Sequence, residues 1–361
     1  MDDFGKKTVV AAIAIVCLTI AIITSFSVGN IVYPIKSIIK NIETDNSYTQ
    51  NSAQILQNDE FCVREVKSGT SGAVCIEQSS KRVLFEDGKD VLRYPASTTK
   101  ILTALIAIER LPLDKKVIVQ KYAEGVEGSS IYLKEGDEIT VEDLLYGLML
   151  RSGNDAAVTL AIEVAGSVEA FADIMNERAK EIGARNSHFV NPHGLHDDNH
   201  YTTAYDLALV CAKAYENDVF LRIANTKQRK ITVSGEDRYI ANKNKLLKLF
   251  DGANGVKTGY TKKSGRCLVG GAKRGDMQLI TVVLNHGDMW NDTVRMLNFG
   301  FDNYEMIPLD KAMLTNGNDV VKFKISQNVT RNWRDIKYPI KRDGSERLVV
   351  ESVWLQCNYF C

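Results

Sequence analysis

The sequence has no excess charge of either sign, because 45 lysine and arginine residues balance 45 aspartate and glutamate residues. This balance argues against the chain-wide basic surface of a nucleic-acid-binding protein and against an acidic solvating tail, so no nucleic acid is expected as a partner. Proline is scarce, with six residues, which argues against extensive low-complexity disorder. The seven cysteines are odd in number and lack Cys-x-x-Cys spacing, so they indicate neither a disulfide scaffold nor a thiolate metal site.

What the sequence does contain is enough apolar material for a large folded core. Apolar residues make up 45% and charged residues 25% of the 361 residues, which are ordinary values for a globular protein. At roughly 100–200 residues per domain, this length predicts two domains, or one large domain with appendages. A chain of this size buries a sizeable core without disulfides or metals.

The N-terminal region determines the expected compartment. No residue from 8 to 35 carries a charge, and this run exceeds the ~20 residues that a membrane-spanning helix needs. Lys6 and Lys7 precede it, and Ser25 and Ser27 offer the small side chains that a signal peptidase reads. A buried core helix is the less favoured alternative. We therefore predict export, with residues 1–35 serving as a cleaved signal peptide or a membrane anchor, a choice that the sequence leaves open.

The distribution of polar and apolar residues divides the rest of the chain into three segments. Residues 36–69 are rich in Asn, Ser, Gln and Thr, which predicts a polar lead-in or stalk. Residues 70–307 alternate strand-like and helix-like apolar runs and form the expected main domain. Residues 308–361 form an expected small β appendage, because residues 321–325 alternate with the period of a half-buried strand.

Within the main domain, strands are expected at both ends and helices between them, which predicts the α+β class. Residues 73–76 and 82–85 indicate a hairpin, and residues 278–284 a strand. Thr140 and Thr203 resemble residues that cap helix N-termini, and Gly183 resembles a helix stop. Helices are expected from Ser97, from Thr140, and over residues 156–165, 170–182, 203–215 and 290–299.

The sharpest local feature is Ser97-Thr98-Thr99-Lys100. A serine hydroxyl becomes a strong nucleophile only when a nearby base takes its proton. Three residues apart on a helix, Ser97 and Lys100 share a face. Lysine acts as a base only when its pKa is lowered, and the apolar residues that follow make its burial plausible. The pattern is common by itself, since Ser37-Ile38-Ile39-Lys40 repeats it.

Two further stretches strengthen this interpretation. Ser152-Gly153-Asn154 follows an apolar helix and begins the next, where short polar side chains project into a cleft. Lys257-Thr258-Gly259 is expected to lie on a strand, with a glycine that lets a substrate backbone approach and with Lys257 and Thr258 facing a carboxylate. Alone, each is weak: Ser326-Gln327-Asn328 repeats the first pattern, and an exposed turn is the alternative for the second. The three in this order carry more weight than any one.

These motifs resemble those of the penicillin-recognising serine peptidases, specifically the D-alanyl-D-alanine carboxypeptidases of peptidase family S11. The resemblance covers about residues 70–305. It is carried by residues 95–100, 152–157 and 257–261, and residues 191–195 and 203–206 also look like family segments. It implies a β-lactamase/transpeptidase-like fold in which a five-stranded antiparallel sheet is flanked by helices.

The resemblance also implies the chemistry and the roles of the residues. The substrate would be a peptidoglycan pentapeptide ending in D-Ala-D-Ala, at the extracytoplasmic face of a bacterial membrane, or outside the cell if residues 1–35 are cleaved. β-Lactams would acylate the same serine, and no cofactor or metal is expected. Ser97 would be the nucleophile, Lys100 its base, and Ser152 a proton relay working with Lys257. The expected substrate-binding residues are Asn154 for the acyl-side amide, Lys257 and Thr258 for the terminal carboxylate, and Gly259 and Tyr260, with the Ser97 and Tyr260 N–H groups as the oxyanion hole.

One departure and three alternatives accompany this prediction. Residues 288–292 lack an arginine that many relatives use to hold the carboxylate, which leaves more of that task to Lys257 and Thr258. A class A β-lactamase is disfavoured, because its Glu-x-x-Leu-Asn segment is not found and Gly153 stands where that class has aspartate. A zinc peptidase using the histidine-rich residues 193–200, and a non-catalytic wall-binding or β-lactam-sensing module, are weaker alternatives.

Overall fold

The computed structural model describes residues 71–309, 317–325 and 336–352, and all that follows concerns those residues. The expected signal or anchor and the polar lead-in lie outside them. Within the described ranges, no helix combines the length and apolar character needed to cross a bilayer.

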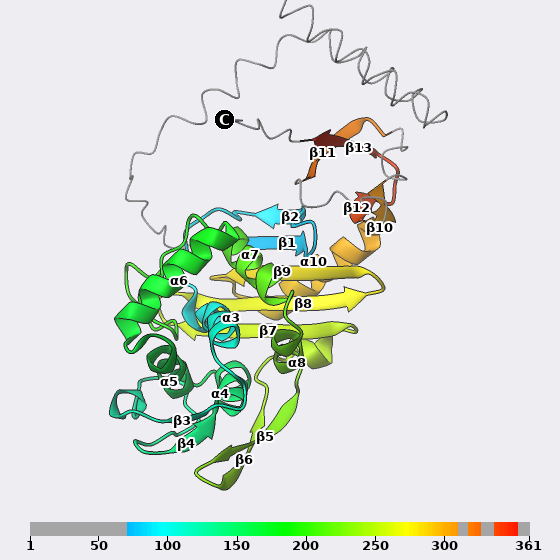
Figure 1. The fold of residues 1–361 in the computed structure, drawn as a ribbon. Coiled ribbons are helices and arrows are strands. Elements are labelled where there is room, and N and C mark those ends of the chain that lie inside the picture. The colour runs from blue at the N-terminus through cyan, green and yellow to red at the C-terminus, as the bar shows by residue number, and fades with distance from the viewer. Residues whose placement is uncertain (1–70, 310–316, 326–335, 353–361) are drawn as a thin grey trace, which may run out of the picture. The chain divides into compact units, whose positions relative to one another are not determined.

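A five-stranded antiparallel sheet forms the centre of the main domain, in the order β2-β1-β9-β8-β7 (Figure 1). Its strands are β1 (Gly72–Glu77), β2 (Val83–Asp87), β7 (Ala253–Thr261), β8 (Gly265–Arg274) and β9 (Met277–Leu284). Every residue of β9 is buried, because β9 lies in the middle of the sheet and both of its faces are covered. The predicted hairpin and the five-stranded sheet are confirmed, and β7 is an edge strand.

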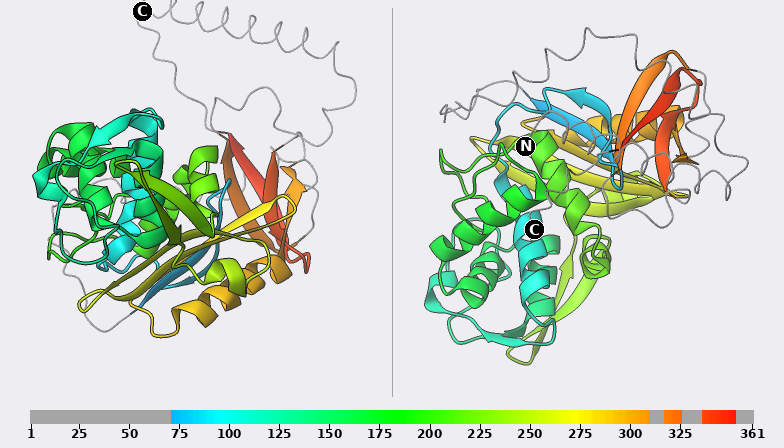
Figure 2. Two further views of the ribbon diagram at one scale, coloured as in Figure 1. Left: turned by 90° about the horizontal axis from the view of Figure 1, so that it is seen from below. Right: turned by 45° about the horizontal axis from the view of Figure 1, so that its top comes forward.

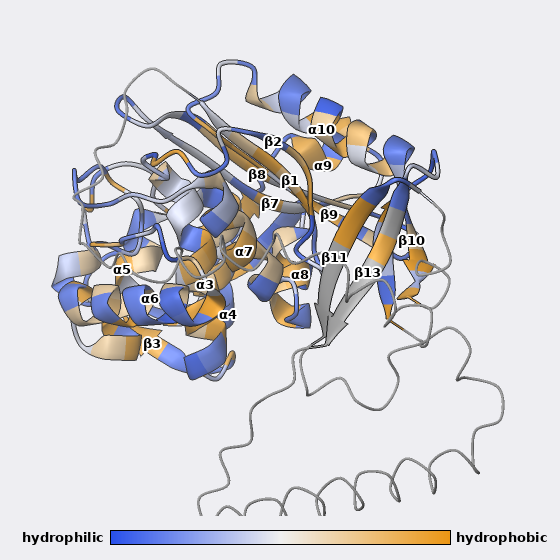
Figure 3. Cartoon of the chain, turned by 90° about the horizontal axis from the view of Figure 1, so that it is seen from above, coloured by the Kyte–Doolittle hydropathy of each residue, from blue (hydrophilic) through white to orange (hydrophobic). Residues whose placement is uncertain are grey.

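Helices cover both faces of this sheet (Figures 2 and 3). On one face, α10 (Met289–Asn303) packs Met296 and Leu297 against strand residues such as Leu268 and Leu279. On the other face, α3 (Lys100–Arg110) and α7 (Ala204–Ala214) join a larger core that includes Ile101 and Val282. Because a core covers each face of the sheet, the central strands carry apolar residues on both faces.

The remaining helices form a region beside the sheet. The capping and stop residues predicted from the sequence lie at the ends of α4, α6 and α7. Thr140 accepts the Asp143 N–H at the start of α4, and Thr203 accepts the Asp206 N–H at the start of α7. Gly183 ends α6 with a φ of 99°, which favours glycine. These helices are α4 (Val141–Tyr146), a π-helical turn (Gly147–Arg151), α5 (Asn154–Ala165), α6 (Val168–Ile182), α8 (Asp218–Ala224) and the short α9 (Leu246–Leu249).

A second sheet lies outside the sequence-based expectations. It has the strand order β3-β4-β5-β6, with β3 (Lys116–Ile118), β4 (Glu138–Thr140), β5 (Gln228–Val233) and β6 (Glu236–Ala241). Its strands are short or mostly exposed, so they carry little apolar signal. Two short 3-10 turns, Ala96–Thr99 and Lys121–Ala123, complete this part of the chain.

Two strand pairs follow α10, and the first of their strands begins before the predicted C-terminal β segment of residues 308–361. β10 (Tyr304–Pro308) pairs antiparallel with β12 (Lys337–Lys341), and β11 (Asp319–Ile325) pairs parallel with β13 (Glu346–Ser352). The strand predicted from alternation at residues 321–325 therefore lies within β11.

Candidate active site

Ser97 lies in the 3-10 turn Ala96–Thr99, and α3 begins only at Lys100. The sequence predicted the serine in the first turn of an α-helix, so the structure shifts the helix start by one turn. Two threonines hold this turn, because the Thr98 and Thr99 hydroxyls donate to the carbonyls of Pro95 and Ala96 at 2.6 and 2.8 Å. Ala96 has a φ of 49°, an uncommon conformation for a residue with a side chain.

Lys100 projects back to the serine. Its Nζ lies 3.1 Å from Ser97 Oγ, and it donates to Asn154 Oδ1 and to the His193 carbonyl, both at 2.6 Å. A neutral amine has two N–H groups and one lone pair. Because two acceptors take the two N–H groups, the lone pair of a neutral Lys100 is left for the Ser97 hydroxyl.

The surroundings of Lys100 favour that neutral form. The side chain is completely buried, and this burial, followed by the positive charge of Lys257, holds the pKa of Lys100 well below its usual range. The negative charge of Asp155 acts in the opposite direction but is the smaller influence. The geometry and the electrostatics together fit the predicted role of Lys100 as the base.

Asn154 stands at the first position of α5, where its side chain is buried inside the protein. Its Oδ1 accepts from Lys100, and its Nδ2 donates to the Glu127 carbonyl. The structure thus gives Asn154 a positioning contact with Lys100 that the sequence did not predict. Its expected contact with the acyl-side amide of the substrate stays a prediction.

Ser152 ends the π-helical turn in the left-handed conformation, with a φ of 66°. This conformation reverses the chain between α4 and α5 and places Ser152 in the wall of the same cleft as Ser97. Strained backbone at two serine-bearing turns is typical of functional sites, where surrounding structure holds a side chain in an unusual position.

Strand β7 brings the third motif to this place. Gly259 packs so closely on the serine turn that a methyl group added to it would meet Pro95 O and Ser97 N at 3.0 Å. Lys257 is buried, and its Nζ donates to the Thr258 carbonyl at 3.0 Å. Burial, with a smaller contribution from Lys243, lowers the pKa of Lys257 to about 7. The structure therefore brings together all three predicted motifs.

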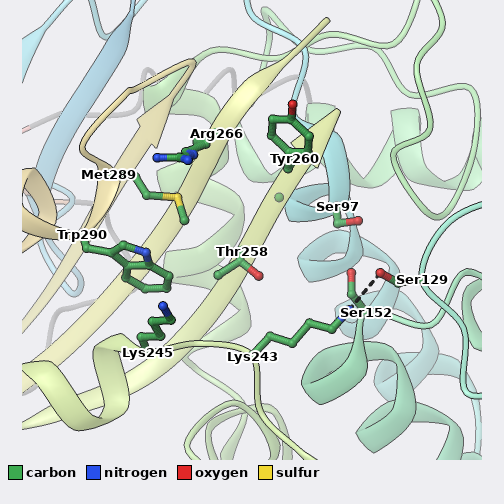
Figure 4. A pocket seen from close by; sticks show the side chains of 11 residues that line it. Ser97, Ser129, Ser152, Lys243, Lys245, Thr258, Tyr260, Arg266, Met289 and Trp290 are labelled. Carbon is green, nitrogen blue, oxygen red and sulfur yellow. Dashed lines mark hydrogen bonds between the residues drawn. The ribbon is translucent and has the colours of Figure 1, made fainter. Parts of the chain in front are cut away.

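A cleft of about 770 Å³ opens in front of these motifs (Figure 4). Of the predicted residues, Ser97, Ser152, Thr258, Gly259 and Tyr260 line it directly. Sequence reasoning missed the other lining residues, because they come from several segments and belong to none of the three motifs. These are Ser129, Lys243, Lys245, Arg266, Met289 and Trp290.

The histidine-rich segment lies behind the serine turn. Gly194 packs against Ala96, and the His193 carbonyl binds Lys100 as described above. His200 accepts the Val190 N–H at Nδ1, and its Nε2 lies 2.8 Å from Thr99 Oγ1. Burial lowers the pKa values of His193 and His200 to about 3. In the part of the chain that the structure describes, no three His, Cys, Asp or Glu side chains gather as metal ligands.

Known proteins share this arrangement. Residues 59–288 match the profile of peptidase family S11, D-alanyl-D-alanine carboxypeptidase. DacF, a D-alanyl-D-alanine carboxypeptidase of Bacillus subtilis, is 35% identical over 272 residues, or 73% of this chain and 69% of DacF. DacC of Escherichia coli is 35% identical over 249 residues, or 65% of this chain and 62% of DacC. The crystal structure of the Streptomyces K15 DD-transpeptidase superposes with a TM-score of 0.61 and 32% identity, covering 66% of this chain and all of that one.

Proposed function

Because the chain belongs to the D-alanyl-D-alanine carboxypeptidase family of serine peptidases, we propose that Ser97 is the nucleophile that removes the terminal D-alanine from peptidoglycan stem peptides. The single observation that carries this assignment is the position of Lys100 Nζ, 3.1 Å from Ser97 Oγ. Its two other contacts are with hydrogen-bond acceptors, Asn154 Oδ1 and the His193 carbonyl. The match to the family profile spans more than half of the chain.

In acylation, the Ser97 hydroxyl proton passes to Lys100 as Oγ bonds to the carbonyl carbon of the penultimate D-alanine. The developing oxyanion is placed at the backbone N–H groups of Ser97 and Tyr260, since β7 is an edge strand packed on the serine turn. The peptide C–N bond then breaks. The proton that Lys100 took passes through Ser152 to the leaving amine, so D-alanine departs and Lys100 is neutral again.

In deacylation, water gives a proton to Lys100 and attacks the ester carbonyl, and Ser97 leaves with a proton returned from Lys100. A β-lactam follows the same first step, because its ring amide occupies the place of the scissile peptide bond. Its amine stays tethered after ring opening, so it remains near the acyl bond and hinders the entry of water.

The test uses a labelled penicillin and a peptide ending in D-Ala-D-Ala with the full chain. We expect covalent labelling and D-alanine release by the wild type, and loss of both in Ser97→Ala. Ser37→Ala is a matched control, because it removes the serine of the second Ser-x-x-Lys copy and should change neither readout. Labelling that persists in Ser97→Ala would overturn the assignment.

The location of the protein is a separate part of the proposal. The charge-free residues 8–35 support export and association with the bacterial membrane, with the main domain on the extracytoplasmic side. Protease added to intact spheroplasts should then degrade the main domain, while a cytoplasmic marker stays whole. Protection of the domain until the membrane is broken would contradict export.

A further inference from the structure

The charge of the cleft is one-sided. Among its described lining residues, Lys243, Lys245 and Arg266 are basic and none is acidic. Lys100 and Lys257 lie buried next to it. A concave surface with cations of this density attracts an anionic ligand, and the carboxyl-terminal group of a peptide is such an anion.

The lysines near Ser97 are poorly suited to hold a carboxylate. Lys257 is buried, already donates to the Thr258 carbonyl, and loses its charge near neutral pH because its pKa is about 7. Lys243 donates to the Ser129 hydroxyl at 3.0 Å, on the side of the cleft that carries Ser97 and Ser152 (Figure 4). Of the described cations that line the cleft, Lys245 and Arg266 remain, and the planar fork of an arginine matches a carboxylate better than an ammonium group does.

The place of Arg266 in the sheet also suits a partner of the carboxylate. It stands opposite Tyr260 in the β7–β8 register, and Thr258 lies two residues from Tyr260 on the same strand. Paired antiparallel residues and residues two apart share a sheet face, so Arg266, Tyr260 and Thr258 lie on one face. Figure 4 shows Thr258 between Ser97 and the group formed by Arg266, Met289 and Trp290.

The guanidinium of Arg266 is held by one hydrogen bond and keeps other N–H donors for a ligand. One of its amino groups donates to the Gly287 carbonyl at 3.1 Å, immediately before α10. Arginine has five N–H donors and stays charged at all physiological pH values. This hydrogen bond restricts the movement of the guanidinium and leaves further donors for a carboxylate.

We infer that Arg266 binds the C-terminal carboxylate of the peptide substrate, together with the Thr258 hydroxyl. This inference rests on the proposed function. It places on β8 the arginine that residues 288–292 lack, and it differs from the sequence-based expectation that Lys257 and Thr258 carry this task. Arg266 acts in substrate selection and leaves proton transfer to Lys100 and Ser152.

The experiment compares a peptide ending in D-Ala-D-Ala with the same peptide as a C-terminal amide. The wild type should prefer the free acid. Arg266→Gln should lower the ratio of kcat/KM for acid over amide by about 10- to 100-fold, the range expected for one hydrogen-bonded charge pair. The loss should come from the acid alone, because the amide does not use the charge. Arg266→Lys should keep part of the preference.

Two variants serve as controls. Lys273→Gln removes an exposed charge at the far end of β8 and should leave the ratio unchanged. Lys245→Gln tests the other unassigned cation of the cleft. An unchanged ratio in Arg266→Gln, or a loss confined to Lys245→Gln, would overturn the inference. A wild type that releases no D-alanine would instead refute the proposed function, so the two failures are distinguishable.

Discussion

Two buried lysines dominate the site at the scale of single residues. Both lie in surroundings that oppose a positive charge, and each shares its ammonium or amine hydrogens with acceptors from the protein. For Lys100 this environment lowers the pKa well below its usual range, which favours the neutral amine that the proposed role of base requires. For Lys257 it produces a group that titrates within the physiological range, since its pKa is about 7. Burial thus supplies the reactivity of the site and lowers the stability of the fold.

The Lys257 pKa predicts a pH dependence of stability. In the unfolded chain this lysine keeps its proton up to its ordinary pKa of 10.5, whereas the folded protein releases it near pH 7. Between these values the unfolded state binds more protons than the folded state. The free-energy cost of burying this lysine therefore falls as the pH rises, and the free energy of unfolding increases by up to about 1.4 kcal/mol per pH unit. Urea unfolding of the wild type and of Lys257→Met at pH 7.5 and 9 measures this slope.

Lys257→Met should lose this part of the slope, because methionine does not titrate. It should also be more stable than the wild type at pH 7.5, by about 1–4 kcal/mol, as when buried charged groups are replaced by apolar ones of similar volume. The difference between the two proteins removes the contribution of other titrating groups. Equal slopes would show that Lys257 has an ordinary pKa in the folded state.

At the scale of elements, the site depends on how closely β7 approaches the serine turn. Gly259 faces Pro95 O and Ser97 N, and Gly194 packs against the Ala96 carbonyl from another side. The turn that carries Ser97 is therefore enclosed by two backbone segments that come near only because they lack side chains at these positions. This enclosure fixes the distance between the nucleophile and the edge of β7.

Gly259→Ala tests this approach. Its methyl group would meet the backbone of the serine turn at 3.0 Å, so β7 must shift away from Ser97. A misplacement of this kind lowers the acylation rate by about 100-fold. Stopped-flow measurement of penicillin acylation records the change. Gly287→Ala is the control, because a methyl group there meets open space. Equal acylation rates in Gly259→Ala and the wild type would contradict the proposed role of this contact.

The sequence predicts the elements better than it predicts the cleft. Helix caps at Thr140 and Thr203 are visible because the capping oxygen and its partner N–H lie within one turn of chain. β9 is visible because an all-buried strand is a continuous apolar run. β5 and β6 escape prediction because most of their residues are exposed, and the long-range pairing that makes them strands leaves no local pattern.

The site residues that the sequence did not reveal are also those that depend on contacts between distant parts of the chain. Ser97 and Lys100 belong to one short motif, and resemblance to a family supplies the other two motifs. Arg266 and Trp290 enter the cleft only because β8 and the start of α10 lie next to β7 in space. Nothing in the chain near Trp290 indicates this neighbourhood, whereas Arg266 follows the third motif on the paired strand and received no role from the sequence. The fold class and the three motifs were thus predictable, whereas the far wall of the cleft needed the structure.

At the scale of the whole molecule, the C-terminal strands are tied to the catalytic sheet through Arg82, at the start of the β2 hairpin arm. Its guanidinium donates to the Pro339 carbonyl and pairs with Glu346, whose side chain is 4% exposed. The rings of Tyr304 and Tyr338 lie 5.1 and 5.6 Å from it. One arginine therefore contacts β10, β12 and β13 at once.

Arg82→Met should loosen this connection without affecting catalysis. It leaves the buried Glu346 carboxylate with only the Lys341 backbone N–H at 3.0 Å and the Lys341 ammonium at 3.8 Å, so we expect a local loss below the about 3–5 kcal/mol of a fully unpaired buried charge. Hydrogen exchange at residues 337–341 and 346–352 should speed up, while the penicillin acylation rate stays at the wild-type value.

The exposed pair between Arg342 and Glu305 provides the matched control, because Glu305→Gln removes an ion pair at 3.5 Å that water already screens and leaves the Arg342 bond to the Tyr304 carbonyl in place. Adding Glu346→Gln to Arg82→Met removes the buried charge that has lost its arginine partner and should recover part of the protection, since the two side chains act as one unit. Unchanged exchange in Arg82→Met would mean that apolar packing around Tyr338 and Leu348 holds these strands by itself. A fall in acylation would instead show that the C-terminal strands support the geometry of the cleft.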